Sequence, residues 1–514
     1  MQKYVYLFTL LVFVVWLGGL VGAASAAAQT LKKNIVLVLS DDQDLLLGSL
    51  EWMSATKQFM IREGTSMTNH FTSTPVCCPS RSSIITGRFP HNYKQQTKHS
   101  KTSCLDPESD DSTVFVKLHE AGYRVGLFGK HMNEDGMGPY CPQSEGDQGE
   151  MPSGIDHYLA MCPDTCYVDC VFAKGDTYGG TTEWVRPKDH AGYHTSIIGN
   201  RTLTFVRDTV EANIPFFVYV SPHAPHLPCT PAPWYEDAPI AGGAPRNPAF
   251  NASSSDKHWM VAQQPPLSAK DAQQLDEIFR NRTKTLLSVD DIVHDVVGLL
   301  KELNVDNNTY VVYTSDHGFH LGSYRLGAAK RQVYDTDLRV PLLVRGPNIR
   351  QNANVSILSS HVDLAPTLMD MAGLLPDLSM DGKSLLPALT NVATPSSSSA
   401  WRTQIYVEYQ GLGTVGRDVL RRIQRCPNNT FAGIRRVEKD ADLLYSEFDA
   451  SNVDFTFQDP EFVEMYRFSN DPYQLSNRAQ IESQGTIREL RESLHSMLNC
   501  SGSSADAETA SCFV

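Results

Sequence analysis

Residues 34–42 read Asn-Ile-Val-Leu-Val-Leu-Ser-Asp-Asp, an unbroken apolar run that ends in a hydroxyl and two carboxylates. A short apolar run rich in β-branched residues is typical of a strand that is buried on both faces of a parallel sheet. The functional groups of such sheets gather at the carboxyl ends of the strands. The stretch therefore predicts a central strand and places Asp41 and Asp42 at the functional edge of the sheet.

Similar strand patterns recur along the chain and alternate with helical patterns. A helical pattern over 113–122 ends in Gly, and apolar residues recur at helical spacing over 288–303. Further strands are expected at 124–128, 215–220, 309–313 and 341–344. This alternation predicts a layered α/β domain with a mostly parallel sheet.

The chain changes character near Thr394. Residues 395–399 read Pro-Ser-Ser-Ser-Ser, which is typical of a linker or an exposed loop. Beyond them we expect strands at 404–409 and 431–436 and a final helix at 487–498. We therefore predict a smaller C-terminal α+β domain over 395–514.

The N-terminus is typical of a secretory signal. Lys3 precedes an apolar run over 4–21, and small residues at 24–28 provide cleavage sites. An uncleaved membrane anchor is the alternative, because the apolar run nearly reaches spanning length. We expect a cleaved signal peptide over 1–28 and no stable membrane span. The protein would then enter the secretory pathway and reach either the lysosome or the extracellular space.

Glycosylation and cysteine signals agree with export. Seven Asn-x-Ser/Thr acceptor sites follow the apolar run: Asn200, Asn251, Asn281, Asn307, Asn354, Asn428 and Asn499. The 11 cysteines fit an oxidising compartment. Cys500 and Cys512 are placed to close a loop in the tail, and residues 140–189, rich in Cys, Gly and Pro, predict a loop excursion pinned by disulfides.

The overall charge restricts the partners. The formal net charge is -14 at pH 7. An acidic chain repels nucleic acids and anionic membranes, so neither class of partner is expected. An anionic substrate would need a local positive pocket.

A second pair of polar residues follows another predicted strand. Asp316 and His317 come directly after the strand pattern at 309–313, as Asp41 and Asp42 follow theirs. One Asp pair alone is more often the N-cap of the next helix. Carboxylates from two strand ends instead favour an oxygen-rich site for a hard divalent cation.

Cys77 lies in an unusual context. Residues 77–81 read Cys-Cys-Pro-Ser-Arg, and Pro79 would lie in the first turn of a helix. A helix N-terminus favours negative charge and lowers the pKa of a thiol. From this context alone Cys77 could be a disulfide cysteine, a reactive thiolate or a modified residue.

The sequence around Cys77 resembles the signature of the type I sulfatases. In these enzymes the first cysteine of Cys-x-Pro-Ser-Arg is oxidised to formylglycine. The sequence Thr-Gly-Arg follows a few residues later in the signature. The chain matches the signature at Cys77, Pro79, Ser80, Arg81, Thr86, Gly87 and Arg88. Further stretches are similar in family order at 41–43, 129–130, 225–226, 314–318, 330–332, 340–347, 361–367 and 380–386.

Within the family the chain most resembles the N-acetylglucosamine-6-sulfatases and the related algal and fungal arylsulfatases. The supporting stretches lie at 76–80, 90–92, 244–247, 257–259 and 285–291, and in the tail at 464–466, 471–472 and 500–502. The resemblance implies an alkaline-phosphatase-like catalytic domain over 29–394.

The resemblance also implies the residues of the site. Calcium would be the cofactor, held by Asp41, Asp42, Asp316, His317 and the modified Cys77. Arg81 would hold the formylglycine, Lys130 and Lys330 would bind sulfate oxygens, and His226 would bind substrate or protonate the leaving oxygen. A formylglycine-generating enzyme would be a partner during maturation, and ten cysteines, an even number, would remain after modification of one of the 11.

The chain departs from the family pattern at one position. Many sulfatases place a His two residues after the lysine that corresponds to Lys130, and this chain has Met132 there. His131 is adjacent but would point elsewhere on a strand. Its role is left open.

The expected function is hydrolysis of sulfate monoesters, with N-acetylglucosamine-6-sulfate units or aryl sulfates as substrates. One alternative is a phosphoesterase of the same superfamily, which often uses zinc; the Cys-x-Pro-Ser-Arg signature and the shortage of His ligands argue against it. Another is a non-catalytic glycan-binding protein in which Cys77 stays unmodified. The full set of charged site residues argues against that reading.

Overall fold

The run at residues 34–40 forms a central strand, β1 (Asn34–Ser40), and all of its residues are buried. β1 pairs in parallel with β9 (Thr309–Ser315) on one side and with β8 (Phe216–Ser221) on the other. Leu37 lies opposite Val312 in β9 and opposite Tyr219 in β8. The strand predicted from its unbroken apolar run is therefore confirmed.

The structure is a computed structural model. It describes residues 32–93, 104–105, 111–133, 138–162, 165–189, 192–375, 377–390, 401–411, 429–438, 441–449, 455–502 and 512. The signal peptide predicted over 1–28, the linker predicted at 395–399 and the acceptor Asn428 lie outside these residues.

The described part contains an 11-stranded sheet in the order β13-β2-β12-β9-β1-β8-β3-β5-β6-β7-β4. The strands from β9 to β5 are all parallel, as is the pair β13 and β2, whereas β12 runs antiparallel to both of its neighbours. The sheet is thus mostly parallel, as predicted. The remaining bounds are β2 Thr65–Phe71, β3 Arg124–Gly129, β4 Gln148–Glu150, β5 His157–Met161, β6 Phe172–Gly175, β7 Thr181–Val185, β12 Leu342–Arg345 and β13 Ala353–Ser360.

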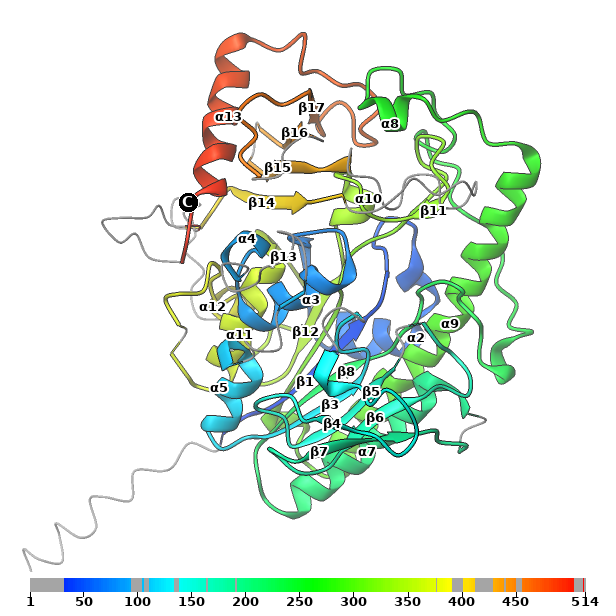
Figure 1. The fold of residues 1–514 in the computed structure, drawn as a ribbon, viewed down its shortest axis with the longest axis vertical. Coiled ribbons are helices and arrows are strands. Elements are labelled where there is room, and N and C mark those ends of the chain that lie inside the picture. The colour runs from blue at the N-terminus through cyan, green and yellow to red at the C-terminus, as the bar shows by residue number, and fades with distance from the viewer. Residues whose placement is uncertain are drawn as a thin grey trace, which may run out of the picture. The chain divides into compact units, whose positions relative to one another are not determined.

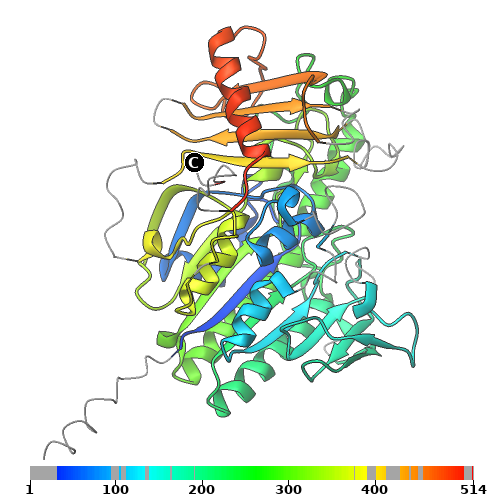
Figure 2. The ribbon, with the colours of Figure 1, turned by 60° about the vertical axis from the view of Figure 1, so that its left-hand side comes forward.

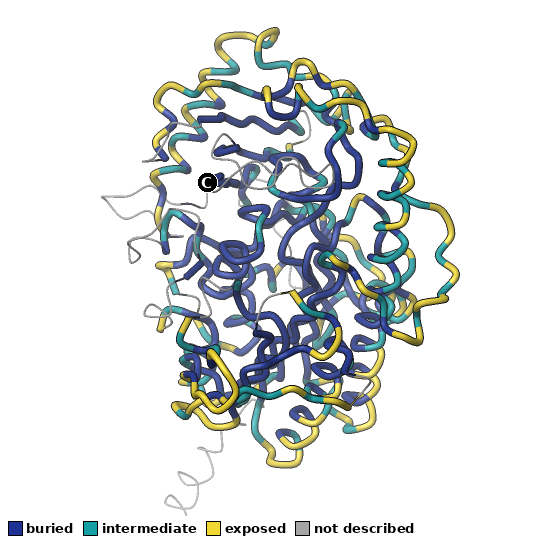
Figure 3. The backbone as a smooth tube through the Cα atoms, turned by 45° about the vertical axis from the view of Figure 1, so that its right-hand side comes forward, coloured by how far each residue is buried: buried dark blue, intermediate teal, exposed yellow. Residues whose placement is uncertain are grey.

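Helices cover both faces of this sheet (Figures 1 and 2). Alternate residues of β1 point to opposite faces: Ile35, Leu37 and Leu39 join one apolar cluster, and Val36 and Val38 join another. The first cluster packs against α3 (Cys77–Thr86), α5 (Val114–Glu120), α11 (Leu364–Met371) and α12 (Leu386–Leu389). The second packs against α7 (His194–Glu211) and α9 (Ala269–Glu302). Burial on both faces explains why residues 35–39 of β1 are all apolar. In Figure 3 the buried stretches of backbone run mainly through the interior, and the exposed stretches lie mainly at the periphery.

The described residues also form several shorter elements. The helices are α2 (Ser54–Thr56), α4 (Pro90–Tyr93), α8 (Trp259–Ala262) and α10 (Asp335–Leu338), and a two-stranded ribbon is formed by β10 (His320–Leu321) and β11 (Ala328–Ala329).

Two segments differ from their predictions. The helix expected at 288–303 is α9, which begins much earlier, at Ala269, where Ser268 and Asp271 form a capping box. The segment 140–189 is pinned by the disulfides Cys141–Cys162 and Cys166–Cys170, but it is not a loop excursion. It contains β4 to β7, which extend the central sheet at one edge.

A second, smaller sheet lies in the C-terminal part. Its strands are β14 (Gln404–Tyr409), β15 (Phe431–Arg436), β16 (Leu443–Phe448) and β17 (Phe462–Arg467), all antiparallel and in sequence order. The helix α13 (Gln484–Leu498) packs on this sheet through Leu490 and Leu494 (Figure 1). The predicted α+β character is confirmed, and its boundary at 395 remains a prediction.

A buried ion pair connects the two sheets. Arg435 on β15 contacts Asp335, the first residue of α10, with 3.1 Å between Nε and Oδ1. The guanidinium also stacks on the Phe468 ring, 3.7 Å from its centroid. Both charged side chains are almost fully buried; Arg435 also pairs with Asp442 at 2.5 Å, whereas the Asp335 carboxylate is compensated by Arg435.

Most of the described cysteines form disulfides, as expected for a protein in an oxidising compartment. The Cys500–Cys512 disulfide is confirmed, and Cys78 bonds Cys104. Among the described cysteines, Cys77 and Cys229 are buried and form no disulfide, and Cys426 lies outside the described residues. Among the acceptor asparagines, Asn200, Asn307, Asn354 and Asn499 are exposed, and Asn251 and Asn281 are half-buried.

Within the part of the chain that the structure describes, no helix has the length and apolar character needed to cross a bilayer.

We expect Arg435→Ala to lower the free energy of unfolding by about 3–5 kcal/mol, because it leaves the Asp335 carboxylate buried without its cation. Arg436→Ala is the matched control: its partner Glu489 is 63% exposed, so the loss should stay below about 1 kcal/mol. Urea unfolding of the two variants measures the difference. Equal losses would show that the buried pair does not hold the sheets together.

Candidate functional site

The loops after four neighbouring strands, β9, β1, β8 and β3, carry six of the predicted site residues, and the other three lie on α3 and after β11. Asp41 and Asp42 follow β1, and Asp316 and His317 follow β9. Backbone hydrogen bonds link the strand ends, from Asp316 N–H to Ser40 C=O at 3.1 Å and from Lys130 N–H to Ser221 C=O at 2.8 Å. The structure thus brings together all nine predicted residues: Asp41, Asp42, Cys77, Arg81, Lys130, His226, Asp316, His317 and Lys330.

Cys77 lies at the centre of this cluster, as the first residue of α3. Its Sγ is 3.1 Å from Lys330 Nζ and 3.4 Å from His317 Nε2. Asp41 Oδ1 lies 3.7 Å away. Burial alone would raise the pKa of the Cys77 thiol, but Lys130 and Lys330 hold it well below its usual range. The position therefore stabilises a negatively charged group.

Lysines compensate the two carboxylates after β1. Lys130 Nζ donates to Asp41 Oδ2 at 2.7 Å, and Lys330 Nζ donates to Asp42 Oδ1 at 2.5 Å. Burial opposes ionisation of Asp41, yet Lys130 and its other cationic neighbours hold the pKa of that carboxyl well below its usual range. Burial likewise opposes ionisation of Asp42, whose pKa Lys330 keeps lowered. Both carboxylates are thus charged although they are buried.

Arg81 compensates the third carboxylate. Its Nε donates to Asp316 Oδ2 at 3.0 Å, Nη2 lies 2.9 Å from the same oxygen as an ion pair, and Nη1 donates to the Lys130 carbonyl at 2.8 Å. Nη1 also donates to Ser221 Oγ at 2.6 Å. This guanidinium therefore fixes α3, β3 and β9 relative to one another at the site.

His317 and Asp316 influence each other's protonation. Burial, with the charges of Asp41 and Cys77, raises the pKa of Asp316 to about 6, against the opposing effect of His317 and Arg81. Burial would lower the pKa of His317, but Asp316 and Asp42 raise it to about 9. His317 Nδ1 donates to the Gly318 carbonyl at 2.9 Å, so Nε2 is the atom directed at Cys77.

The donor set fits a calcium ion. The ligand atoms of Asp41, Cys77, Asp316 and His317 lie within 4.8 Å of one another. Two ligands of one calcium, each bound at about 2.3–2.6 Å, can be at most about 5 Å apart. Buried carboxylate oxygens are the donors that a hard cation prefers, whereas the nitrogen of His317 and the sulfur of Cys77 are softer donors.

His226 is the member of the cluster that faces solvent. Its side chain is 18% exposed, whereas the other predicted site residues are buried. Nδ1 donates to the Leu227 carbonyl at 2.5 Å, and Nε2 lies 3.9 Å from Asp42 Oδ2. A donor atom of His226 also lies within 4.8 Å of Cys77 Sγ. The imidazole thus lies between the buried charges and the solvent.

His223 belongs to the site and is absent from the predicted set. It is fully buried, and its Nδ1 lies 3.0 Å from Asp41 Oδ2. Burial lowers the pKa of His223 to about 4. Its place after β8, three residues before His226, was a signal that could have identified it.

His131, whose role was left open, does not face the cluster. Its Nδ1 contacts the Tyr158 hydroxyl at 3.1 Å. Burial lowers the pKa of His131 to about 3, so the imidazole stays neutral. Its neighbour Met132 packs beside Ser82, with 3.9 Å between Sδ and Oγ.

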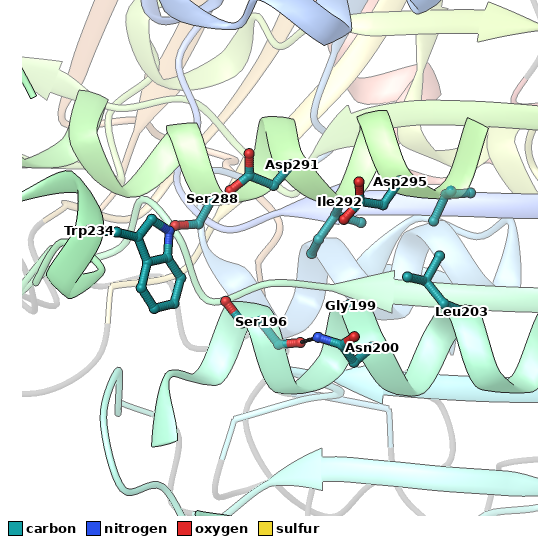
Figure 4. A pocket seen from close by; sticks show the side chains of 10 residues that line it. Ser196, Gly199, Asn200, Leu203, Trp234, Ser288, Asp291, Ile292 and Asp295 are labelled. Atoms are coloured by element: carbon teal, nitrogen blue, oxygen red, sulfur yellow. Dashed lines mark hydrogen bonds between the residues drawn. The ribbon is translucent and has the colours of Figure 1, made fainter. Parts of the chain in front are cut away.

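A groove of about 410 Å³ lies elsewhere, between α7 and α9. Figure 4 shows Trp234 at one end, Asn200 and Ser196 along α7, and Asp291 and Asp295 along α9. None of the clustered site residues lines it. The site at the strand ends is therefore separate from this groove.

Comparisons with known proteins agree with the geometry. The profile of the sulfatase family matches residues 33–374. N-acetylglucosamine-6-sulfatase of Capra hircus is 34% identical over 511 residues, which cover 94% of this chain and 87% of that protein. Arylsulfatase of Chlamydomonas reinhardtii is 29% identical over 514 residues, covering 91% and 74%.

Solved structures show the same fold. A protein solved in complex with its substrate, D-glucosamine-2-N,6-O-disulfate, superposes with a TM-score of 0.69 at 21% identity. The match covers 90% of this chain and 97% of that chain.

We expect calcium to stabilise the protein against heat and chelation to remove this stabilisation. At a calcium concentration 100 times the dissociation constant the gain is about 2.7 kcal/mol. Asp316→Asn removes a buried carboxylate and should abolish most of the response. Asp295→Asn, whose carboxylate is 55% exposed, should keep it. Thermal unfolding with and without calcium measures the effect, and an unchanged response in Asp316→Asn would exclude this carboxylate as a ligand.

Proposed function

The chain belongs to the sulfatase family, and from this premise we propose that it hydrolyses sulfate monoesters with a formylglycine at position 77 and a bound calcium ion. The observation that carries the proposal is the position of Cys77. Its Sγ contacts Lys330 and His317 at the centre of a buried, charged cluster. The hydroxyls of a hydrated aldehyde at this position would meet the same cationic groups.

The proposed modification supplies the nucleophile. Formation of formylglycine is a two-electron oxidation of the side-chain carbon; the sulfur leaves as hydrogen sulfide, and an external oxidant such as molecular oxygen is required. A formylglycine-generating enzyme would carry this out during maturation. Hydration of the aldehyde then gives two hydroxyls on one carbon.

The two hydroxyls have separate tasks. The first attacks sulfur, and the bond from sulfur to the substrate's alcohol oxygen breaks, which leaves a sulfate ester on residue 77. The second hydroxyl then loses its proton, the aldehyde re-forms and sulfate departs. Water hydrates the aldehyde again, so the net reaction consumes one water for each ester.

Positive charge around position 77 explains how an anion can be attacked. A sulfate monoester presents oxygens that share a negative charge and repel a nucleophile. Lys130 and Lys330 are buried within hydrogen-bonding distance of Asp41 and Asp42 and can also reach sulfate oxygens. Calcium, when bound by the Asp residues and His317, would add positive charge at the same place.

The solvent-facing position of His226 supports a role at the leaving oxygen. The alcohol part of a substrate must extend towards solvent, because the rest of the cluster is closed by protein. His226 lies on that side, with Nε2 free of backbone partners and Nδ1 fixed by the Leu227 carbonyl. We therefore assign proton donation to His226 Nε2.

Similarity to the relatives supports the proposed substrate class. Similarity over most of the chain to N-acetylglucosamine-6-sulfatase supports a sugar 6-sulfate, and similarity to an algal arylsulfatase supports aryl sulfates. The acceptor sites for N-glycans and the apolar N-terminus support passage through the secretory pathway, to the lysosome or the extracellular space.

We expect the peptide that contains Cys77, taken from active protein, to be lighter than the cysteine form and to react with hydrazide probes. The aldehyde accounts for both properties. Mass spectrometry of the purified, active protein measures them. Full activity in a preparation whose Cys77 is entirely a thiol would overturn the mechanism.

We expect His226→Ala to damage hydrolysis of a sugar sulfate more than hydrolysis of an aryl sulfate. A sugar alkoxide is a poor leaving group and depends on an acid, whereas a phenolate does not. General acid catalysis is typically worth about 10²- to 10⁴-fold, so the ratio of the two kcat/KM values should change by a comparable factor. His131→Ala is the control, because His131 faces Tyr158 and not the cluster. Equal losses on both substrates would contradict the role of His226.

A further inference from the structure

Arg282 on α9 is a buried cation outside the predicted site, and it is only 3% exposed. Its guanidinium lies over the Phe319 ring, 3.9 Å from the centroid. Phe319 follows Asp316 and His317 in the loop after β9. The side chain therefore packs against one of the loops that form the site.

Hydrogen bonds from the same guanidinium reach two further site loops. Nη2 donates to the Asp42 carbonyl at 2.7 Å and to Asp44 Oδ1 at 3.1 Å, both in the loop after β1. Nη1 donates to the Pro225 carbonyl at 3.1 Å, in the loop after β8. β9, β1 and β8 are neighbours in the sheet. One planar group thus joins the loops of three adjacent strands.

The contact with Asp42 acts on a strained part of the backbone. Asp42 has a φ of 69°, a left-handed conformation that a non-glycine residue adopts only when its surroundings enforce it. Asp316 Oδ1 accepts from the Asp42 N–H at 3.0 Å, and Arg282 donates to its carbonyl. Both backbone groups of Asp42 are therefore anchored, which directs its carboxylate towards Lys330 and His317.

The contact with Pro225 acts on the other side of the site. Pro225 precedes His226, whose Nε2 is 3.9 Å from Asp42 Oδ2. Because Arg282 holds the carbonyls of both Asp42 and Pro225, it sets the separation between the Asp42 carboxylate and the His226 imidazole.

We propose that Arg282 is a positioning residue that holds Asp42 for the cation and His226 for the leaving group. It touches neither the substrate nor the reacting atoms. The two carbonyls are bound by two different nitrogens of the planar guanidinium, whereas a lysine has a single nitrogen and cannot reproduce this pair of donors. The inference rests on the proposed function, both for the role of His226 and for the calcium ion, but calcium binding can be measured without turnover.

The test uses Arg282→Lys in the full-length protein, with two measurements. Calorimetry gives the calcium dissociation constant, and kinetics give kcat/KM for a sugar 6-sulfate and for an aryl sulfate. We expect calcium affinity to fall by about 10- to 100-fold, as for other partners that orient ligands. The sugar sulfate should lose more activity than the aryl sulfate, because His226 is displaced as well.

The matched control is Arg280→Lys, one half-turn earlier on α9, whose Nη1 donates to the Gly242 carbonyl. It should leave calcium affinity and the substrate ratio within about twofold of the parent protein, since it contacts none of the site loops. If Arg282→Lys does not fold, Asp44→Asn loosens one anchor of Arg282 and should shift both quantities in the same direction by less.

Unchanged calcium affinity in the folded variants, or a fall of both activities by one common factor, would overturn the proposal. A protein that merely contains less folded enzyme loses both activities equally and keeps its ratio. A parent protein that turns over neither substrate would refute the proposed function instead, and the calcium measurement would still test Arg282.

Discussion

Charge compensation among buried side chains is the constraint on which the site depends. Asp41, Asp42 and Asp316 are buried at one edge of the sheet, where isolated carboxylates would be strongly unfavourable. Lys130, Lys330 and Arg81 each contact one of them at hydrogen-bonding distance. The strands, the helix α3 and the ribbon of β10 and β11 must therefore meet within a few ångströms for the fold to be stable.

This balance also prepares the proposed chemistry. The three carboxylates and three cations cancel in formal charge, so a divalent cation and an anionic ester can enter together without leaving a large excess of either sign. Cys77 lies between Lys330, His317 and Asp41, which places the proposed nucleophile at the boundary between the cation and the ester. Arg282 adds a second set of anchors behind Asp42 and Pro225.

The sequence allowed the centre of the fold to be predicted better than its edges. Residues 35–39 of β1 are all apolar because both faces of the strand are buried, and an unbroken apolar run in the sequence indicates this directly. The first half of α9 was missed because its buried face includes Arg282 and Thr283, which do not follow an apolar pattern. The strands β4 to β7 lie in a segment rich in Cys, Gly and Pro, and such composition resembles a loop. In the site, the residues of the family motifs were predicted from the order of those motifs along the chain. His223 and Arg282 lie outside the motifs, and their contacts are created only by the tertiary fold.

The central claim is that residue 77 carries the sulfate during turnover and that the second hydroxyl is needed to release it. Cys77→Ser supplies one hydroxyl at the same place and no second one. Mass spectrometry of this variant after incubation with an aryl sulfate tests the claim most directly. The account predicts at most one turnover per molecule and a stable sulfate on the peptide that contains position 77. Repeated turnover without sulfate on that peptide would contradict it.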